Sequence, residues 1–114
     1  MKLNLSDFWS LFSIPEPVVE YKFLTDRRFR FDFAWLKYRI AVEINGGVFI
    51  GGRHTRGYGY QRDMEKLNLA QAAGWKVFQF TPQQFKNGEA GEFLEEIFRK
   101  EIDENHRPHP SQIG

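Results

Sequence analysis

The chain has no cysteine among its 114 residues. This absence excludes disulfide scaffolds, zinc sites built from thiolates and cysteine nucleophiles, and it suits a reducing compartment. Long apolar runs are also missing, so we expect no transmembrane helix. Because Lys2 is followed within five residues by Ser6 and Asp7, we expect no secretory signal peptide. These absences predict a cytoplasmic protein with no membrane partner.

The net charge is also small: the chain has 16 Lys and Arg residues and 15 Asp and Glu residues, which gives +1. Taken as a whole, a near-neutral chain argues against a nucleic-acid partner. The charges are unevenly distributed, however. Residues 1–88 carry 13 basic and 8 acidic side chains, a balance of +5, whereas residues 89–114 carry 3 and 7, a balance of −4. The chain therefore has a basic body followed by an acidic segment.

The basic side chains of the body are interleaved with aromatic ones. The basic set is Lys22, Arg27, Arg28, Arg30, Lys37, Arg39, Arg53, Arg56 and Arg62, and the aromatic set is Tyr21, Phe29, Phe31, Tyr38, Tyr58 and Tyr60. Such a combination suits the phosphates and bases of a nucleic acid. The alternative is a solvated face on which arginine stems lie over aromatic rings. Composition leaves both interpretations open.

Hydrophobic periodicity predicts the elements of secondary structure. Alternation with a period of two predicts strands at 18–23, 29–35, 40–45 and 75–80. Helical spacing predicts helices at 6–12 and 61–73, the second ended by Gly74, and an acidic amphipathic helix that follows Asn87-Gly88 with Phe93, Leu94, Ile97 and Ile102 inward. We expect one domain over residues 1–105 and a flexible tail over 106–114.

The order of these elements predicts the fold class. The first three strands have short connections and predict an antiparallel meander, and the helix at 61–73 then crosses over to the fourth strand. We therefore expect an α/β (α+β) fold in the order α-β-β-β-α-β plus a C-terminal helix. Its mixed four-stranded sheet is flanked by helices.

Three carboxylates occupy the centres of predicted strands, namely Glu20, Asp32 and Glu43. Strand centres disfavour aspartate, so Asp32 requires an explanation. Alternation puts the aromatic residues of strand 29–35 in one row on one face and Asp32 on the other. One interpretation is therefore a one-sided sheet whose polar face meets water.

The helix that follows the glycine-rich loop supports a second interpretation. Its apolar stripe of Leu67, Ala70 and Ala73 needs a surface to cover, and the polar side of the sheet is available. Asp63 and Lys66 lie on the same stripe, so the strand acids would converge beside them in a cleft. Converging carboxylates repel one another unless they share a cation, and their oxygens suit Mg²⁺ or Mn²⁺.

The glycine-rich loop contains one histidine, His54, flanked by Arg53 and followed by Arg56. A histidine held near arginines could act as a general acid or base beside a phosphate. The alternative is an ordinary solvated loop histidine. The loop matches neither nucleotide-binding glycine motif, so it gives no support to nucleotide binding.

Several short motifs now resemble a known family when they are taken in order. They are Phe31-Asp32-Phe33, Val42-Glu43-Ile44-Asn45-Gly46-Gly47, Arg53-His54, Arg62-Asp63 and Gly74-Trp75. They resemble the PD-(D/E)XK (restriction-endonuclease-like) nucleases, and more narrowly the Vsr-like branch with its E-D-x-H-D pattern. That branch contains very-short-patch repair endonucleases with their phage and homing-endonuclease relatives. The resemblance covers about residues 18–85.

This resemblance implies a metal-dependent endonuclease that hydrolyses DNA phosphodiesters. It implies that Asp32 is the principal ligand of Mg²⁺ or Mn²⁺ and that Glu43 is the second acid of the metal site. His54 would assist proton transfer, and Asp63 would orient His54 or the attacking water. Each of these residues matches the family pattern at its position in this chain.

The chain departs from the family pattern at two positions. The usual lysine of (D/E)xK is Asn45 here, and Lys66 on the following helix is the predicted replacement. Glu20 would be the first acid of E-D-x-H-D, but it precedes Asp32 by only twelve residues and lies in a strand, where the family usually has a helix.

The function expected is a small DNA endonuclease of a bacterial or phage-infected cell, which nicks DNA or acts on structures such as mismatches or junctions. Cutting both strands would require a homodimer. The alternatives are an inactive DNA-binding module on the same fold and an accessory domain whose acidic last helix binds a basic protein. The predicted DNA contacts are Arg27, Arg28, Arg53, Arg56 and Arg62, with Tyr58 and Tyr60 stacking on a base.

Overall fold

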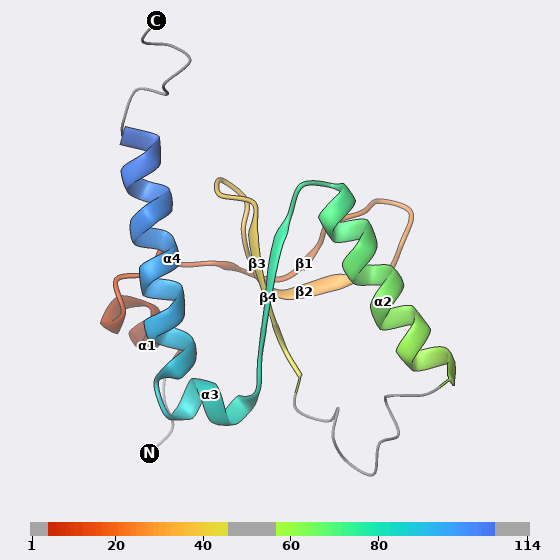
Figure 1. The fold of residues 1–114 in the computed structure, drawn as a ribbon, viewed down its shortest axis with the longest axis horizontal. Helices are drawn as coiled ribbons and strands as arrows, with labels where there is room; N and C mark the ends of the chain where they lie inside the picture. The colour runs from red at the N-terminus through yellow and green to blue at the C-terminus, as the bar shows by residue number, and fades with distance from the viewer. Residues whose placement is uncertain (1–4, 46–56, 107–114) are drawn as a thin grey trace, which may run out of the picture. The chain divides into compact units, whose positions relative to one another are not determined.

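The structure is a computed structural model that describes residues 5–45 and 57–106, with side chains described over 5–45 and 61–104. Its elements are α1 Leu5–Leu11, β1 Val18–Lys22, β2 Arg30–Trp35, β3 Ile40–Ile44, α2 Gly57–Ala72, β4 Lys76–Phe80, α3 Pro82–Lys86 and α4 Glu89–His106 (Figure 1). The predicted α/β fold class is confirmed. None of the described helices has the length and apolar character needed to cross a membrane.

The chain divides into two compact units. One is continuous, Pro17–Gln84, and contains the sheet and α2. The other combines Met1–Glu16 with Phe85–Gly114 and contains α1 and α4. Residues 107–114, most of the predicted tail, lie outside the described residues.

The sheet of the continuous unit has the order β1-β2-β3-β4 (Figure 1). Strands β1, β2 and β3 form the predicted antiparallel meander, and β4 pairs in parallel with β3 after the crossover through α2. The register pairs Ala34 with Ala41 and Ala41 with Val77. These three small or β-branched residues therefore lie in one row across the sheet, on one face.

Alpha2 packs on this row through a small residue of its own. Ala70 is fully buried and belongs to one hydrophobic cluster with Ala34, Ala41, Phe31 and Trp75. Because all three alanines have only a methyl group, the helix backbone can approach the sheet closely. The prediction that this helix covers the side of the sheet that carries the acids is thereby confirmed.

The end of α2 follows a Schellman motif. Gly74 has φ = 90°, its N–H donates to Gln71, and the N–H of Trp75 donates to Ala70. The prediction that Gly74 ends the helix is confirmed, since glycine adopts this left-handed conformation without the cost of a Cβ. Ala73, predicted in the buried stripe, is exposed because the helix has already ended.

Strand β2 does not carry the single aromatic row that alternation predicts. Phe31 packs in the same cluster as Ala34, three residues further on, although regular pleating would put them on opposite faces. Phe33 is next to Ala34 in the strand and therefore faces the other way. The row is interrupted at Asp32, whose Oδ2 accepts a 2.7 Å hydrogen bond from the Ile44 N–H. A residue count along the strand does not anticipate this break in the alternation.

The second unit is built around aromatic side chains of α1. The Phe8 ring lies 5.0 Å from the rings of Trp9 and Phe12 and 5.5 Å from that of Phe85, measured between centroids. Phe12 in turn lies against Gly91 of α4, where a Cβ would come within 2.3 Å of its ring. Glycine at position 91 is therefore required for α1 and α4 to approach.

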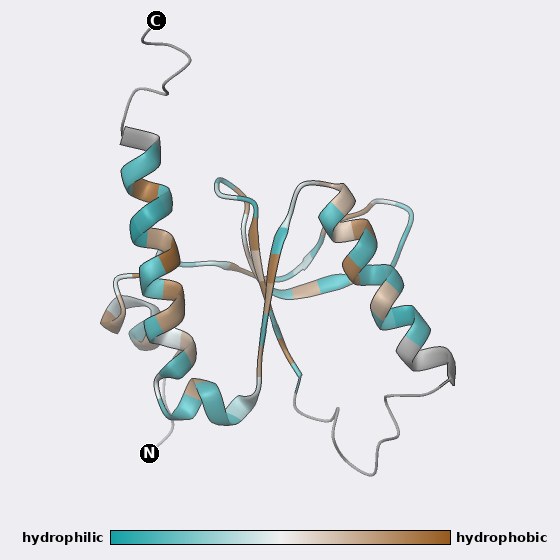
Figure 2. Cartoon of the chain, in the orientation of Figure 1, coloured by the Kyte–Doolittle hydropathy of each residue, from teal (hydrophilic) through white to brown (hydrophobic). Residues whose placement is uncertain are grey.

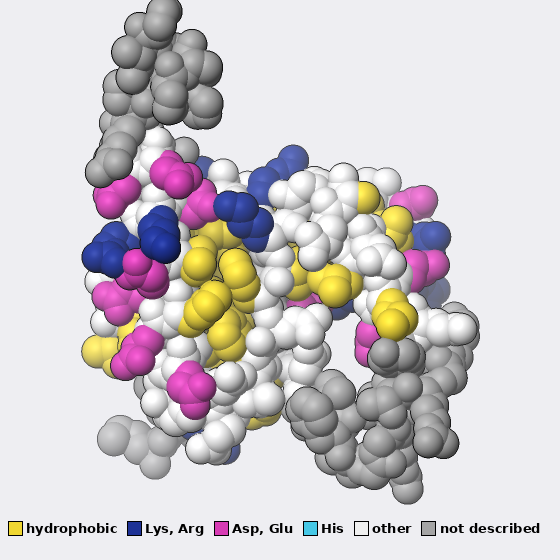
Figure 3. All heavy atoms as spheres, viewed as in Figure 1, with side chains coloured by type: hydrophobic (Ala, Val, Ile, Leu, Met, Phe, Trp, Pro, Cys, Tyr) yellow, Lys and Arg dark blue, Asp and Glu magenta, His cyan; other side chains and the backbone are white. Residues whose placement is uncertain are grey.

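Helix α4 is amphipathic, with acidic side chains along its outer surface (Figures 2 and 3). Its fully buried residues are Ala90, Leu94 and Phe98. Phe93, predicted to point inward, is 46% exposed, and Phe98 takes its place in the buried stripe. The assignment of Phe93 was wrong because its neighbour Leu94 is equally apolar and the sequence alone does not fix the phase of the helix.

Helix α3 was not predicted, although its sequence contains a start signal. The Thr81 N–H donates to Gln84 Oε1 at 2.9 Å, and the Gln84 N–H donates to Thr81 Oγ1 at 3.2 Å. This reciprocal pair is a capping box, and Pro82 occupies the first helical position, where proline is favoured.

The close contact at Ala70 leads to a prediction about stability. We expect Ala70→Leu to lower the free energy of unfolding by about 1–3 kcal/mol, because a larger side chain overpacks the helix–sheet contact. Urea unfolding measures this change. Ala72→Leu, at an exposed position two residues further along α2, is the control and should change stability by less than about 0.5 kcal/mol. Equal effects at the two positions would contradict the packing described.

Candidate active site

The side chain of Glu43 on β3 lies at the centre of the candidate site. It is ion-paired with Lys66 of α2, and the side chains of Lys66 and Glu43 are only 20% and 14% exposed. Position 66 is one helical turn before the buried Ala70, so the same close packing that buries Ala70 brings the lysine over the sheet. The register pairs Phe33 with Val42, and Asp32 and Glu43 are their neighbours in the two adjacent strands.

The electrostatic surroundings of Glu43 reflect this crowding. Burial raises the pKa of the Glu43 carboxyl above its ordinary value, and the nearby carboxylates of Asp32 and Asp63 raise it further. The hydrogen bond and positive charge of Lys66 act in the opposite direction but do not cancel the rise in the pKa. The structure thus brings together Asp32, Glu43, Asp63 and Lys66.

The Asp32 carboxylate is half-buried and held by the backbone. Its Oδ2 accepts the Ile44 N–H, so the carboxylate is oriented by the neighbouring strand. Its Oδ1 has no hydrogen bond from the described part of the chain, and the same holds for Glu43 Oε2. The site therefore presents two carboxylate oxygens from adjacent strands.

These oxygens fit Mg²⁺ or Mn²⁺. A hard divalent cation is commonly held by one or two carboxylates, with water and substrate phosphates completing its coordination. The repulsion among Asp32, Asp63 and Glu43 is also of the kind that a shared cation relieves. Within residues 5–45 and 57–106, no group of three or more acidic or histidine side chains is arranged to hold a metal ion.

Asn45 occupies the position of the family lysine, and its N–H donates to the Phe80 carbonyl at 2.9 Å. This bond continues the pairing of β3 with β4. The positive charge beside Glu43 comes instead from Lys66, whose Nζ also lies 6.0 Å from the centre of the Phe31 ring. The catalytic role of Lys66 stays a prediction.

The remaining predicted acids are less enclosed. Asp63 is exposed near the start of α2 and acts on Glu43 through its charge. Glu20 is exposed, has φ = 53°, and lies between Val19 and Tyr21, the residues of β1 that pair with Phe33 and Phe31. It forms no hydrogen bond or ion pair with any other residue in the described part of the chain. Its contribution to the site stays a prediction.

The predicted DNA contacts are partly assembled around Phe29. The guanidinium carbons of Arg27 and Arg62 lie 6.0 and 5.6 Å from the centre of this buried ring. Arg27 is also ion-paired with Glu65 of α2 at 2.8 Å, a contact that sequence reasoning missed because no periodicity describes the β1–β2 connection. Arg28, in the same connection, is exposed.

The other predicted contacts and the predicted histidine fall on residues that are not described. His54, Arg53 and Arg56 lie outside the described residues. Tyr58 and Tyr60 belong to the first turn of α2, which begins at Gly57 rather than Gln61, but their side chains are not among those described.

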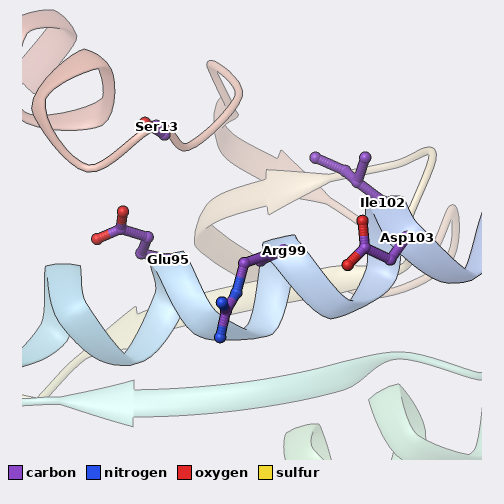
Figure 4. Close-up of a pocket in the computed structure, with 5 residues that line it drawn as sticks. All are labelled: Ser13, Glu95, Arg99, Ile102 and Asp103. Carbon is purple, nitrogen blue, oxygen red and sulfur yellow. The ribbon is translucent and has the colours of Figure 1, made fainter.

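A hollow of about 310 Å³ lies elsewhere, in the unit that contains α1 and α4 (Figure 4). Glu95, Arg99, Ile102 and Asp103 of α4 line it together with Ser13, which follows α1. None of the predicted site residues lines this hollow, so it is not the candidate active site.

The chain matches no family model, no curated protein and no solved structure. The resemblance to the Vsr-like nucleases thus rests on the motif residues and stays a prediction. The contacts around Glu43 are independent of that resemblance.

Glu43 gives the stability of the protein a pH dependence of defined sign. Because its pKa is raised on folding, its contribution is fully present below the ordinary carboxyl pKa and is lost as pH rises through the raised pKa. We therefore expect the free energy of unfolding of the wild type, relative to that of Glu43→Gln, to fall as the pH rises from the ordinary carboxyl pKa through the raised pKa of Glu43. Urea unfolding at several pH values measures the difference.

The control for this measurement is Glu104→Gln, at an exposed position on α4, which should keep the wild-type pH dependence. A difference between wild type and Glu43→Gln that stays constant or grows with pH would contradict the raised pKa.

Proposed function

We propose that the protein is a metal-dependent DNA endonuclease. The observation that carries this proposal is the meeting of Asp32 and Glu43 of the sheet with Lys66 of the crossover helix. Two carboxylates on adjacent strands and a lysine provide the charges that phosphodiester hydrolysis requires. The basic balance of the body and the motif resemblance support DNA as the substrate.

Asp32 and Glu43 would hold Mg²⁺ or Mn²⁺ through the oxygens that the described residues leave unengaged. When bound, the ion stabilises negative charge on the phosphate and lowers the pKa of a coordinated water. The Asp32 carboxylate needs little reorganisation, because the Ile44 N–H already fixes its orientation. A donor or ligand oriented in advance contributes more to catalysis than one that must be ordered during the reaction.

The chain's other residues have distinct proposed roles. Lys66 supplies positive charge where charge develops on the phosphate, in place of the lysine absent at Asn45. His54 moves the proton of the attacking water, and Asp63 orients it. Arg28 and Arg62 bind flanking phosphates, and Arg62 is steadied by its contact with Phe29.

The proposed substrate is DNA in the cytoplasm, nicked at a mismatch, junction or other distorted structure. The described residues contain no large recognition element besides the sheet and helices, which favours reading of DNA shape over a long sequence. Cleavage of both strands requires a second copy of the chain.

A second candidate function is supported by Asn45. Because the usual lysine is absent, the same fold could bind DNA without cutting it. Tight, salt-sensitive binding with no cleavage in either Mg²⁺ or Mn²⁺ would identify this alternative.

Cleavage assays test the nuclease proposal. We expect Asp32→Asn and His54→Ala each to reduce cleavage of supercoiled, mismatched or branched DNA with Mg²⁺ by about a hundredfold or more. Asn keeps the acceptor oxygen for the Ile44 N–H, so Asp32→Asn removes the charge with little effect on folding. Asp26→Asn, at an exposed position, is the control and should cut normally. Cleavage by both site variants at the parental rate would rule out this site.

Binding measurements test the role of Arg62. We expect Arg62→Ala to weaken DNA binding for all sequences alike and to reduce the slope of log K against log salt by about 0.9, the value for one lost phosphate contact. Fluorescence anisotropy over a salt series measures both quantities. Arg99→Ala on α4 removes an equal charge from the other compact unit, so a matching loss there would show that only net charge matters.

A further inference from the structure

The positive charge of Lys66 already occupies the position where the site needs a cation. The lysine is ion-paired with Glu43, and this carboxylate is also influenced by the charges of Asp32 and Asp63. Lys66 therefore supplies the positive charge that lies directly beside Glu43. We propose that Lys66 is the resident cation of this site and that a divalent metal ion binds by displacing it from Glu43. The inference rests on the proposed function.

Lys66 and a divalent metal ion should compete for Glu43, because both would bind its carboxylate oxygens and both are positively charged. Lys66 Nζ engages Glu43 Oε1, one of the two oxygens through which Glu43 could hold a metal ion. An ammonium at this position also repels a divalent ion bound between Glu43 and Asp32. The exposed fractions of the two side chains, 20% and 14%, mean that water screens this repulsion only weakly.

The same ion pair preserves the site when no metal ion is bound. The Lys66 ammonium and the Glu43 carboxylate are both largely buried, and each is the other's ion-pair partner. Removal of Lys66 would leave a largely buried carboxylate without that partner. Lys66 is therefore a positioning residue that holds the Glu43 side chain in place.

The displaced ammonium has another partner on its own helix. Asp63 precedes Lys66 by three residues, so the two side chains lie on the same face of α2. The Phe31 ring, 6.0 Å from Nζ, offers a second favourable contact. A rotation of the lysine side chain, with no movement of the backbone, would transfer its charge from Glu43 to Asp63.

Metal binding to the full chain tests this exchange without reference to cleavage. Isothermal titration with Mn²⁺ should show binding to Lys66→Met about tenfold tighter than to the wild type. Lys66→Arg, which keeps the charge, should bind within about twofold of the wild type. Lys37→Met, which removes a lysine from the turn between β2 and β3, is the control and should bind like the wild type.

Thermal unfolding provides the second measurement. Without metal, Lys66→Met should melt at a lower temperature than the wild type, and saturating Mn²⁺ should raise its melting temperature by more than it raises that of the wild type. If Lys66→Met does not fold, Lys66→Gln replaces it. In the wild type, Mg²⁺ should shift the NMR signals of the Lys66 side chain and leave those of Lys37 unchanged.

Two results would overturn the inference. One is Mn²⁺ binding to Lys66→Met or Lys66→Gln that is equal to or weaker than wild-type binding, and the other is a Lys66 NMR signal that Mg²⁺ does not move. Cleavage assays of the wild type and Asp32→Asn, on the same preparations, distinguish failure of the proposed exchange from failure of the proposed function. Loss of cleavage in Asp32→Asn with unchanged affinity in Lys66→Met rejects only the exchange. A wild type that neither binds Mn²⁺ nor cleaves DNA rejects both.

Discussion

The close contact between α2 and the sheet determines the geometry of the continuous unit. It is formed by a buried cluster in which Ala34 and Ala41 of the strands and Ala70 of the helix pack with Phe31 and Trp75. Because the helix axis lies close to the strands, the residue one turn before Ala70 also reaches the sheet, and that residue is Lys66. Bulkier side chains in this row would lift the helix and separate the lysine from Glu43. The charged site therefore depends on an apolar contact beside it.

Much of the fold was predictable because its periodicities are strong. The three alternating segments and the glycine at position 74 determine the meander and the end of the crossover helix. The start of α2 was predicted four residues late, because Gly57 and Gly59 are typical of loops. Periodicity describes regular elements, so it also missed the break in the alternation of β2 at Asp32.

The candidate site was predictable to the extent that it depends on helical phase. The spacing of Asp63, Lys66 and Ala70 implies one helix face, and the structure brings that face to Asp32 and Glu43. The pairing of Arg27 with Glu65 could not be predicted in this way, since it joins an irregular connection to a helix 38 residues away. Contacts of this kind are determined by the folded path of the chain.

The two compact units divide the charge in the same way as the linear sequence does. Residues 17–84 carry 11 basic and 6 acidic side chains, a balance of +5, and the rest of the chain carries 5 and 9, a balance of −4. The proposed metal ligands thus belong to a unit that remains basic even though it contains them. The acidic surface of α4 belongs to the other unit (Figure 3).

The hydrogen bond from the Ile44 N–H gives Asp32 a structural task that does not depend on charge. Any residue that kept an acceptor oxygen there, asparagine included, would preserve the irregular strand and the packing of Phe31 under α2. Position 32 is therefore constrained by the fold to residues with a short acceptor side chain, whatever chemistry the protein performs. Among the described residues, Glu43 and Lys66 are paired with each other instead, so that pair can change without removing a bond to the backbone of a neighbouring strand.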